Sequence, residues 1–358
     1  MDLEKRIELI SQVGEEVITH EDLRSLLETK TKPIAYDGFE PSGRIHVAQG
    51  IMRAINVNKM MDAGVEFKMY AADWHGWANN KLGGDLEKIQ MCGDYLVEVW
   101  KASGMEVGKV RFIRASDVVD SMEYWKKVLQ IARNSTVKRI IRCAQIMGRK
   151  ESEGLSASQI LYPCMQAADI FELGADITQL GMDQRKVNML AREIGPKLGF
   201  WKPVVVSHHM LMGLLPPATQ EKDKLERTID LKMSKSKPDS AIFMTDSKEE
   251  VERKISKAYC PEKQIHENPI LEYCRYIIFE KFNTFEIVRP AKFGGNVSFA
   301  SYQELESAYA KGNVHPMDLK KAVASYMNRL LDPVRSHFSK NKKAKELAER
   351  VDKLEITR

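Results

Sequence analysis

The chain has 358 residues, of which 43% are hydrophobic and 29% charged, with a formal net charge of +5. This is enough apolar material for two or three domains, and it excludes an intrinsically disordered protein. The longest apolar runs, such as 210–215, are only a few residues, so a membrane span of about 20 residues is not expected. The charged start shows no hydrophobic signal segment, and we expect a cytosolic protein without a membrane partner.

The five cysteines are scattered, without a C-x-x-C pair, and no metal-ligating residues cluster at a recognisable spacing. A disulfide framework and a protein-held metal are therefore not expected. The mildly basic balance permits a polyanionic partner such as a nucleic acid, although many basic proteins bind none.

The chain up to about residue 208 alternates between strand and helix patterns. Residues 1–30 carry apolar residues at helical spacing and are predicted as helix. The strands predicted after them are 32–39, 66–73, 110–115, 175–180 and 204–208. The helices predicted between these strands are 47–61, 85–103, 121–150, 156–173 and 184–194. This alternation predicts an α/β fold with a doubly wound parallel sheet, which binds ligands beyond the carboxyl ends of its strands.

The strand patterns fade after residue 248. Helices are predicted at 249–257, 269–281, 302–311 and 316–340, followed by a basic helix at 340–353. We therefore expect a smaller, mostly α-helical domain to follow the α/β domain.

The strongest local signal is the run Lys232-Met233-Ser234-Lys235-Ser236. Two lysines and two hydroxyls on one loop suit the phosphates of a nucleotide, although such a run is usually a solvated basic loop. This run is identical to the signature loop of class I aminoacyl-tRNA synthetases, and the chain resembles that family. The resemblance implies that Lys232 and Lys235 are catalytic and that all five residues bind ATP.

The same family has a second signature, His-x-Gly-His, at the first helix after the first strand. Here His46 occupies the first position, while Ala48 and Gln49 replace the glycine and the second histidine, which leaves the role of Gln49 open. A helix N-terminus after a Pro-Ser-Gly turn suits a phosphate, because its free N–H groups and dipole attract anions. The resemblance implies that His46 is catalytic. It also implies that ATP contacts residues of this turn, namely Gly38, Glu40, Ser42, Gly43, His46 and Gln49.

Three further segments, 35–43, 162–170 and 181–186, resemble the tyrosyl-tRNA synthetases of archaeal and eukaryotic type. The motifs keep their order over most of the chain, so the resemblance is specific. The tryptophanyl-tRNA synthetases are the closest sister family. His75, which follows the second strand between two tryptophans, is expected either to line the tyrosine or adenylate site or to pack in the core.

Tyr162, Gln166 and Asp169 fall at i, i+4 and i+7 and share one helix face. One polar residue there would be an ordinary satisfied core group, but three need another explanation. The resemblance implies that Tyr36 and Asp169 bind the phenol hydroxyl of the substrate tyrosine, and that Tyr162, Gln166 and Gln184 hold its ammonium group. An indole offers only a donor, so the Tyr36 and Asp169 pair favours tyrosine over tryptophan.

Two C-terminal segments, 289–295 and 315–318, resemble the anticodon-reading segments of this family. The resemblance implies that tRNA contacts one aromatic residue and several polar ones there, namely Phe293, His315, Pro316 and Asp318. A His-Pro pair is equally typical of a helix start. Arg142, Arg185 and Lys186 are expected to face the acceptor stem or to be solvated. The tail lysines are expected to add salt-sensitive phosphate affinity.

These expectations divide the chain into five parts. They are an N-terminal helical segment (1–32), a Rossmann-like catalytic domain (33–231), the lysine loop and linker (232–248), a helical anticodon-binding domain (249–339) and a basic tail helix (340–358). The resemblance implies a homodimer, and we expect the helical stretch 121–150 to be the interface.

The function expected from the resemblance is tyrosine–tRNA ligase, which forms tyrosyl-adenylate from tyrosine and ATP and then transfers the tyrosyl group to tRNA(Tyr). Since the tyrosine carboxylate is already ionised at neutral pH, its attack on the α-phosphate needs no general base. Positioning and charge stabilisation then suffice, with Mg²⁺ brought in by ATP and no protein-held metal.

Three alternatives stay open. The first is the tryptophan enzyme, which shares the fold. The second is a paralogue that forms an adenylate but charges no tRNA. The third is a catalytically inactive RNA-binding or signalling relative, for which the altered Gln49 leaves room.

Overall fold

The computed structural model describes residues 1–143, 147, 154–217, 227, 231–233 and 237–354. Its centre is a six-stranded sheet with the order β1-β6-β5-β2-β3-β4. The strands are β1 (Glu16–Ile18), β2 (Ile34–Phe39), β3 (Glu66–Ala71), β4 (Val110–Arg114), β5 (Ile177–Gly181) and β6 (Val204–His208). All neighbouring strands are parallel except β1, which pairs antiparallel with β6. The α/β prediction is confirmed.

Strands β2 and β5 lie side by side at the centre of the sheet, although two other strands separate them in the chain. The chain adds β3 and β4 on one side of β2, and then β5 and β6 on the other. This is the point where the strand order reverses, and it is where sheets of this kind bind ligands. The chain leaving β2, β3 and β5 therefore meets at one edge of the sheet, as predicted.

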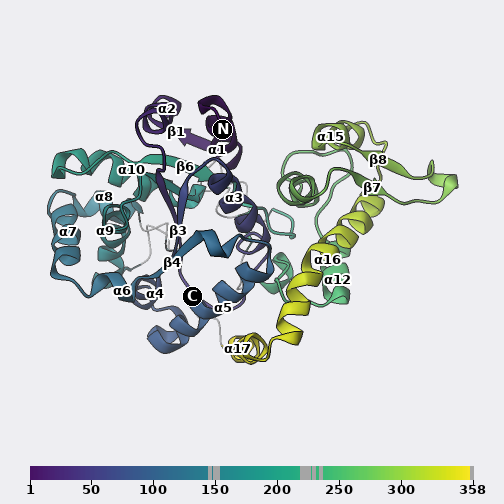
Figure 1. The fold of residues 1–358 in the computed structure, drawn as a ribbon. Helices are drawn as coiled ribbons and strands as arrows, with labels where there is room; N and C mark the ends of the chain where they lie inside the picture. The colour runs from purple at the N-terminus through teal and green to yellow at the C-terminus, as the bar shows by residue number, and fades with distance from the viewer. Residues whose placement is uncertain (144–146, 148–153, 218–226, 228–230, 234–236, 355–358) are drawn as a thin grey trace.

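Helices cover both faces of the sheet. They are α1 (Leu3–Val13), α2 (His20–Thr29), α3 (Ile51–Asp62), α4 (Asp73–Ala78), α5 (Leu86–Ala102), α6 (Ser116–Val119), α7 (Met122–Arg133), α8 (Val137–Cys143), α9 (Ala157–Glu172) and α10 (Arg185–Ile194). In Figure 1, α7, α8 and α9 lie to the left of the sheet and α3 and α5 to its right. Helix α9 begins where predicted because Ser156 and Gln159 form a reciprocal capping box.

Three predicted helices differ in extent from those observed. Residues 1–30 are not one helix, because β1 adds to the edge of the sheet between α1 and α2. The predicted helix 121–150 is interrupted between α7 and α8, where the Asn134 side chain bonds back to the Gln130 carbonyl; most of its last residues lie outside the described part. Helix α3 starts only at Ile51, so the chain from His46 forms a turn before it.

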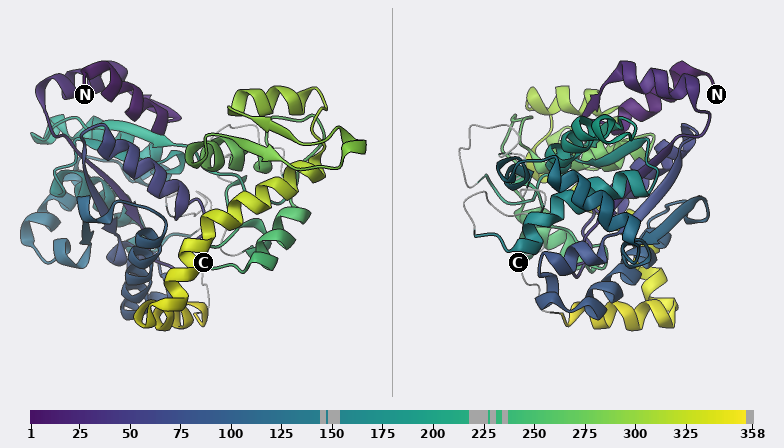
Figure 2. Two further views of the ribbon diagram at one scale, coloured as in Figure 1. Left: turned by 45° about the vertical axis from the view of Figure 1, so that its right-hand side comes forward. Right: turned by 90° about the vertical axis from the view of Figure 1, so that its left-hand side faces the viewer.

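The C-terminal part, residues 237–354, is mostly helical, as predicted. Its elements are α12 (Lys248–Lys257), α13 (Pro269–Tyr273), a π-helical turn (Cys274–Ile278), α14 (Phe279–Lys281), β7 (Phe285–Ile287), β8 (Val297–Phe299), α15 (Tyr302–Ala310), α16 (Pro316–Lys340) and α17 (Lys342–Asp352). The β7–β8 hairpin was not expected. Figures 1 and 2 show the long α16 running from this hairpin toward α17, which packs under the sheet part against α5.

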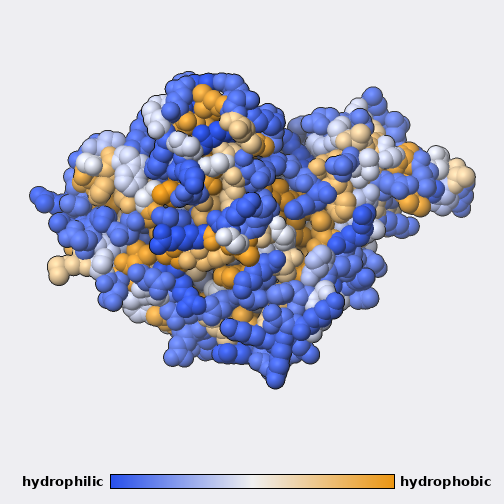
Figure 3. Space-filling view, viewed as in Figure 1, coloured by the Kyte–Doolittle hydropathy of each residue, from blue (hydrophilic) through white to orange (hydrophobic). Residues whose placement is uncertain are grey.

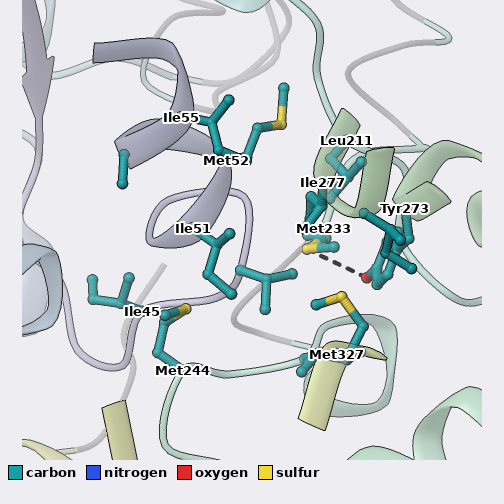
Figure 4. Close-up of a cluster of buried hydrophobic side chains, with 14 of the residues drawn as sticks. Ile45, Ile51, Met52, Ile55, Leu211, Met233, Met244, Tyr273, Ile277 and Met327 are labelled. Atoms are coloured by element: carbon teal, nitrogen blue, oxygen red, sulfur yellow. Dashed lines mark hydrogen bonds between the residues drawn. The ribbon is translucent and has the colours of Figure 1, made fainter. Parts of the chain in front are cut away.

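One hydrophobic core joins the two parts. Figure 4 shows Ile51 and Met52 of α3 facing Tyr273 and Met327 of the C-terminal part. Met233 lies between them, and its sulfur accepts a hydrogen bond from the Tyr273 hydroxyl at 3.9 Å. Hydrophilic residues cover most of the surface in Figure 3, and hydrophobic ones gather mainly in the middle of this face. Among the described residues, no helix is both long enough and apolar enough to cross a bilayer.

Candidate active site

Polar side chains from three elements meet near the ends of β2, β3 and β5. Tyr36 comes from β2, His75 from α4 and Asp169 from α9, and all three are buried. Successive residues of a strand face opposite sides of the sheet, so Tyr36 points toward α9 while Asp37 points toward α3. The edge of the sheet therefore carries two polar clusters, one on each face.

Asp169 is the centre of the first cluster. Its Oδ1 accepts hydrogen bonds from the hydroxyls of Tyr70 and Tyr124, both at 3.0 Å. Its Oδ2 lies 2.9 Å from Nε2 of His75. A carboxylate has about four acceptor positions, so these three partners leave room for one more donor.

His75 is buried and belongs to this cluster. Burial disfavours a charged imidazole, but the charge and hydrogen bond of Asp169 outweigh it and raise the pKa of His75 above its usual value. The ring also meets the ring of Tyr162 edge-on at 5.0 Å between centroids. His75 therefore orients Asp169 and forms part of the wall beside Tyr162.

Sequence reasoning missed Tyr70 and Tyr124. Both lie at apolar positions of a strand and a helix, where a tyrosine resembles any other core aromatic. The available signal was the phenol hydroxyl, because a buried tyrosine normally needs a polar partner. Tyr36 also contributes a buried hydroxyl, which makes no hydrogen bond of good geometry with a described residue. Burial, then the charges of Asp169 and Asp37, raise the pKa of Tyr36 well above its usual value.

The predicted ammonium ligands lie on the other side of the cluster. The side-chain amide of Gln166 donates to Oε1 of Gln184 at 3.0 Å, so α9 and the turn after β5 are joined there. Tyr162 is buried, and this burial, followed by the negative charge of Glu40 and a hydrogen bond to it, holds the pKa of the phenol well above its usual value. Glu40 also accepts from Asn79 at 3.1 Å. Glu40, predicted to contact ATP, thus has its carboxylate against Tyr162.

The predicted nucleotide turn runs from Ser42 to Gln49. Gly43 has a φ of +92°, a conformation open mainly to glycine, and its N–H donates to the thiol of Cys92 at 3.2 Å. His46 is almost buried and pairs through its backbone with Phe243. The Gln49 carbonyl accepts from the Trp100 indole at 2.8 Å. The turn is fixed from several sides before any ligand binds.

The N-terminus of α3 departs from the prediction. The helix begins after Gly50, so His46 stands one turn ahead of it. A β-carbon on Gly50 would come within 2.4 Å of the Met244 sulfur, which shows how closely the two segments approach.

The lysine loop is described only at its first two predicted residues. Nζ of Lys232 lies 2.7 Å from Oδ2 of Asp183, in the turn after β5. Met233 is 5% exposed and packs into the shared core, so its side chain anchors the loop. The other predicted members, Ser234, Lys235 and Ser236, lie outside the described residues.

The second cluster lies on the opposite face of β2. Nε of Arg53 lies 2.9 Å from Oδ2 of Asp37, and its Nη1 lies 2.6 Å from Nε2 of His208. The Gln179 side chain lies 2.8 Å from Nδ1 of the same histidine. Burial raises the pKa of Asp37 to about 7, although the charge of Arg53 opposes that rise. This buried ion pair ties α3 to the central strands. Sequence patterns did not reveal it, because its members are far apart in the chain.

The predicted anticodon segments are brought together. Phe293, in the loop between β7 and β8, is 60% exposed, with the Lys292 ammonium over its ring. The side chain of Arg289 donates to the Asn313 carbonyl at 2.9 Å, which joins this loop to the start of α16. His315 caps α16 by accepting from the Met317 N–H at 3.2 Å.

The remaining members of that segment fit a helix start, the alternative reading noted above. Pro316 occupies the first turn of α16 and Asp318 supplies its acidic residue. His315 caps the helix through Nδ1. The other ring nitrogen of His315 does not take part in this cap.

The residues predicted to face the acceptor stem lie on neighbouring helices. Arg142 is exposed in the last turn of α8, and Arg185 and Lys186 begin α10, which packs on α8. The Arg185 guanidinium lies 2.6 Å from the Glu16 carboxylate, so it also holds β1 in place.

Comparisons with known proteins agree with this geometry. The family model for class I tRNA synthetases (W and Y) matches residues 28–332. The chain is 50% identical to cytoplasmic tyrosine–tRNA ligase 1 of Arabidopsis thaliana, over 100% of this chain and 90% of that protein. It is 51% identical to the cytoplasmic tyrosine–tRNA ligase 2 of the same plant, over 99% of this chain but only 46% of that longer protein. The structure matches a tyrosyl-tRNA synthetase from Pyrococcus horikoshii complexed with L-tyrosine with a TM-score of 0.92 and 40% identity, covering 98% of this chain and 100% of that one.

Proposed function

This chain belongs to the tyrosine–tRNA ligases, class I synthetases that use ATP to charge tyrosine onto tRNA in two steps, and we propose that the cluster around Asp169 is its tyrosine site. The observation that carries this proposal is the convergence of Tyr70, Tyr124 and His75 on Asp169 at the carboxyl ends of the central strands. Three partners fix the carboxylate and leave one acceptor position for the phenol hydroxyl of a substrate.

Recognition of the substrate is divided between the two ends of this site. The phenol hydroxyl of the substrate donates a hydrogen bond to Asp169. The Tyr36 hydroxyl donates a hydrogen bond to the oxygen of the same phenol. At the other end, Tyr162, Gln166 and Gln184 hold the ammonium group. The negative charge of Glu40 next to Tyr162 favours the cation there. An indole has a single N–H donor and no acceptor to match Tyr36, so tryptophan leaves this end of the site unsatisfied.

Activation then depends on charge and position. The tyrosine carboxylate attacks the α-phosphate of ATP without a general base, because it is already ionised. His46, Lys232 and Lys235 stabilise the transferring phosphoryl group and the leaving pyrophosphate. We also assign Gly38, at the end of β2, and Ser42, Gly43 and Gln49, in the nucleotide turn, to the contacts with ATP.

Mg²⁺ enters as a complex with the phosphates of ATP, which are oxygen ligands of the kind it prefers. Within the described residues, no group of three His, Cys, Asp or Glu side chains has the arrangement of a metal site. We assign the residues named above to contacts with ATP, and none of them as a metal ligand.

The tRNA lies across both parts of the molecule. Phe293 stacks on an anticodon base, and His315 and Asp318 contact base edges. The hydrogen bond from Arg289 to the Asn313 carbonyl supports this assignment, because it joins the two segments that carry these residues. Arg142 and Lys186 face the acceptor stem, and Arg185 adds to their positive potential. Lysines 340, 342, 343 and 345 add phosphate affinity that falls with salt.

The protein acts as a homodimer in the cytosol. Three large apolar side chains on α7 and α8 are strongly exposed: Met122 at 87%, Leu129 at 61% and Val137 at 63%. Such residues are usual on a surface that packs against another copy. Sedimentation of the wild-type protein and of Leu129→Asp tests this, with a dimer expected for the first and a monomer for the second.

ATP–pyrophosphate exchange with tyrosine, tryptophan and phenylalanine, measured side by side, tests the function. Exchange with tyrosine alone is expected. Exchange with tryptophan would assign the site to the sister enzyme, and no exchange with any of the three would favour an inactive relative. Charging of tRNA(Tyr) by the same preparation separates the ligase from a paralogue that stops at the adenylate.

A further inference from the structure

Asp246 is a buried carboxylate outside the sites described above. It is 4% exposed and lies between the lysine loop and α12. Its Oδ1 accepts from Nη2 of Arg44 at 2.9 Å, and its Oδ2 accepts from Nζ of Lys254 at 2.7 Å and from the Phe243 N–H at 2.9 Å. These contacts satisfy both carboxylate oxygens, so Asp246 joins three segments of chain.

Arg44 is the member of this group that belongs to the nucleotide turn. It follows Gly43 and precedes His46 by two residues, which is a position where an arginine would be expected to reach toward phosphate. Its side chain is instead directed to the C-terminal part. Besides Asp246, its Nε lies 3.2 Å from Oδ1 of Asp352 at the end of α17, and its guanidinium lies over the Phe243 ring at 4.4 Å.

The backbone continues the same connection. The Val47 N–H donates to the Ile242 carbonyl at 2.9 Å, and the Met244 N–H donates to the Ile45 carbonyl at 2.8 Å. The nucleotide turn on both sides of His46 is therefore paired with the segment that follows the lysine loop. The ion pair between Arg44 and Asp246 joins the same two segments through side chains, close to these backbone hydrogen bonds.

Helix α16 reaches this junction from the opposite end of the C-terminal part. Nε of Arg335 donates to the Asp246 carbonyl at 2.8 Å, and its Nη2 donates to Oδ1 of Asn328 at 2.6 Å. The helix has 25 residues and spans roughly 37 Å. Its N-terminus carries His315 and Asp318, so one helix, with Pro333 inside it, extends from the proposed anticodon surface to the carbonyl of Asp246.

We propose that Arg44 and Asp246 are positioning residues for the ATP site, with Asp352 of α17 as a second anchor for Arg44. Their ion pairs hold the turn containing Gly43 and His46 against the C-terminal part, and Arg44 does not itself bind phosphate. The proposal rests on the proposed function, because it assigns how the ATP site of that ligase is held in place. It also gives α17 a role in ATP use in addition to any contact with tRNA.

Steady-state exchange kinetics of Arg44→Met, Arg44→Lys, Asp246→Asn and Asp352→Asn test the proposal. Arg44→Met and Asp246→Asn are both expected to lower kcat/KM for ATP by roughly 10- to 100-fold through displacement of the turn, with KM for tyrosine unchanged. The double variant Arg44→Met/Asp246→Asn is expected to have a kcat/KM for ATP no lower than that of the more impaired single variant, because both changes break the same contact. Arg44→Lys is expected to restore part of the loss, since it keeps the charge. Asp352→Asn is expected to cost only a few-fold in kcat/KM, because that carboxylate is half exposed.

A loss in Arg44→Met with wild-type kinetics for ATP in both Asp246→Asn and Asp352→Asn would overturn the proposal, because Arg44 would then act on phosphate directly. Asp246→Asn also leaves Lys254 buried without its charge partner and is expected to lower the melting temperature. If that variant does not fold, Arg44→Met and Asp352→Asn decide the question, because they keep the Lys254 pair.

Arg24→Met, which breaks an exposed ion pair with Glu4, is the matched control and is expected to keep wild-type kinetics. A wild-type protein without tyrosine-dependent exchange would refute the proposed function and this assignment with it, whereas an active wild type with unaffected Arg44→Met and Asp246→Asn variants would refute this assignment alone.

Discussion

Nζ of Lys232 lies 2.7 Å from Oδ2 of Asp183, although the two residues are 49 positions apart in the chain. The first lysine of the predicted signature loop is therefore held beside the turn that follows β5. Gln184, a proposed ammonium ligand, is the next residue after Asp183, so the contact brings the two halves of the reaction to one place. The partial exposure of Lys232 leaves its ammonium able to exchange Asp183 for a phosphate.

Lys232→Met is expected to slow tyrosine-dependent exchange by about 100-fold, because the variant loses a charge that stabilises the leaving pyrophosphate. The KM for tyrosine is expected to stay within a few-fold of wild type, since the lysine does not contact the Asp169 cluster. Lys248→Met, which removes an exposed lysine at the start of α12, is the control and is expected to keep the wild-type rate of tyrosine-dependent exchange. Wild-type kinetics in Lys232→Met would show that the loop acts through its other residues alone.

Asp169→Asn is expected to lower kcat/KM for tyrosine by at least about 100-fold, because an amide cannot replace a carboxylate that accepts from two tyrosine hydroxyls and pairs with His75. Tyr124→Phe removes one of these donors and leaves the charge, so a loss of about 10-fold or less is expected. Exchange kinetics with varied tyrosine measure both. A smaller loss in Asp169→Asn than in Tyr124→Phe would contradict the central place given to the carboxylate.

Met233→Ala is expected to lower the free energy of unfolding by about 2–4 kcal/mol, because it leaves a cavity in the core between the sheet part and the C-terminal part. Met233→Leu, which keeps most of the volume, is expected to cost less than about 1.5 kcal/mol. Chemical denaturation measures both values. Equal stability of the two variants would mean that the side chain does not anchor the loop.

The order of the strands from β2 to β6 and of the main helices between them followed from local patterns, because each of these strands is a short apolar run between turn residues and each of these helices has a regular apolar face. The same patterns placed His75 after β3, Gln184 after β5 and Asp169 on the helix between them, as the structure has them. Helical spacing predicted that Tyr162 and Gln166 share one helix face, while their expected role came from the family resemblance.

What the sequence did not reveal are contacts between distant segments. Strand β1 exists because β6 offers an edge, and its own three residues fit a helical pattern equally well. Tyr70 and Tyr124 look like core aromatics until Asp169 is placed between them. Arg53 looked like one polar residue on a helix and is buried only because Asp37 and His208 come from two different strands. In each case the partner, and not the residue itself, decides the role.

His209 forms a further link between the two parts, at the end of β6. Its Nδ1 lies 3.0 Å from Glu15 and its Nε2 lies 3.0 Å from Glu272, and its ring stacks on Tyr276 with 4.2 Å between centroids. Burial favours the neutral ring, but the hydrogen bonds and charges of Glu15 and Glu272 outweigh it and raise the pKa of His209 to about 9. The folded protein therefore holds this proton more tightly than the unfolded chain, whose histidine has a pKa near 6.5.

The stability from this proton is fully present below about pH 6.5 and is lost as the pH rises through about 9. His209→Gln is expected to destabilise the protein at pH 6 by about 3 kcal/mol, and the difference from wild type is expected to shrink steadily toward pH 10. Urea denaturation of both proteins between pH 6 and pH 10 measures this difference directly. Taking the difference cancels the contributions of other groups that titrate in this range, such as Asp37.

His20→Gln, which replaces an exposed histidine at the start of α2, is the control and is expected to follow the wild-type curve. A difference between His209→Gln and wild type that does not change with pH would show that the imidazole is neutral in the folded protein, and that it links the two parts by packing alone.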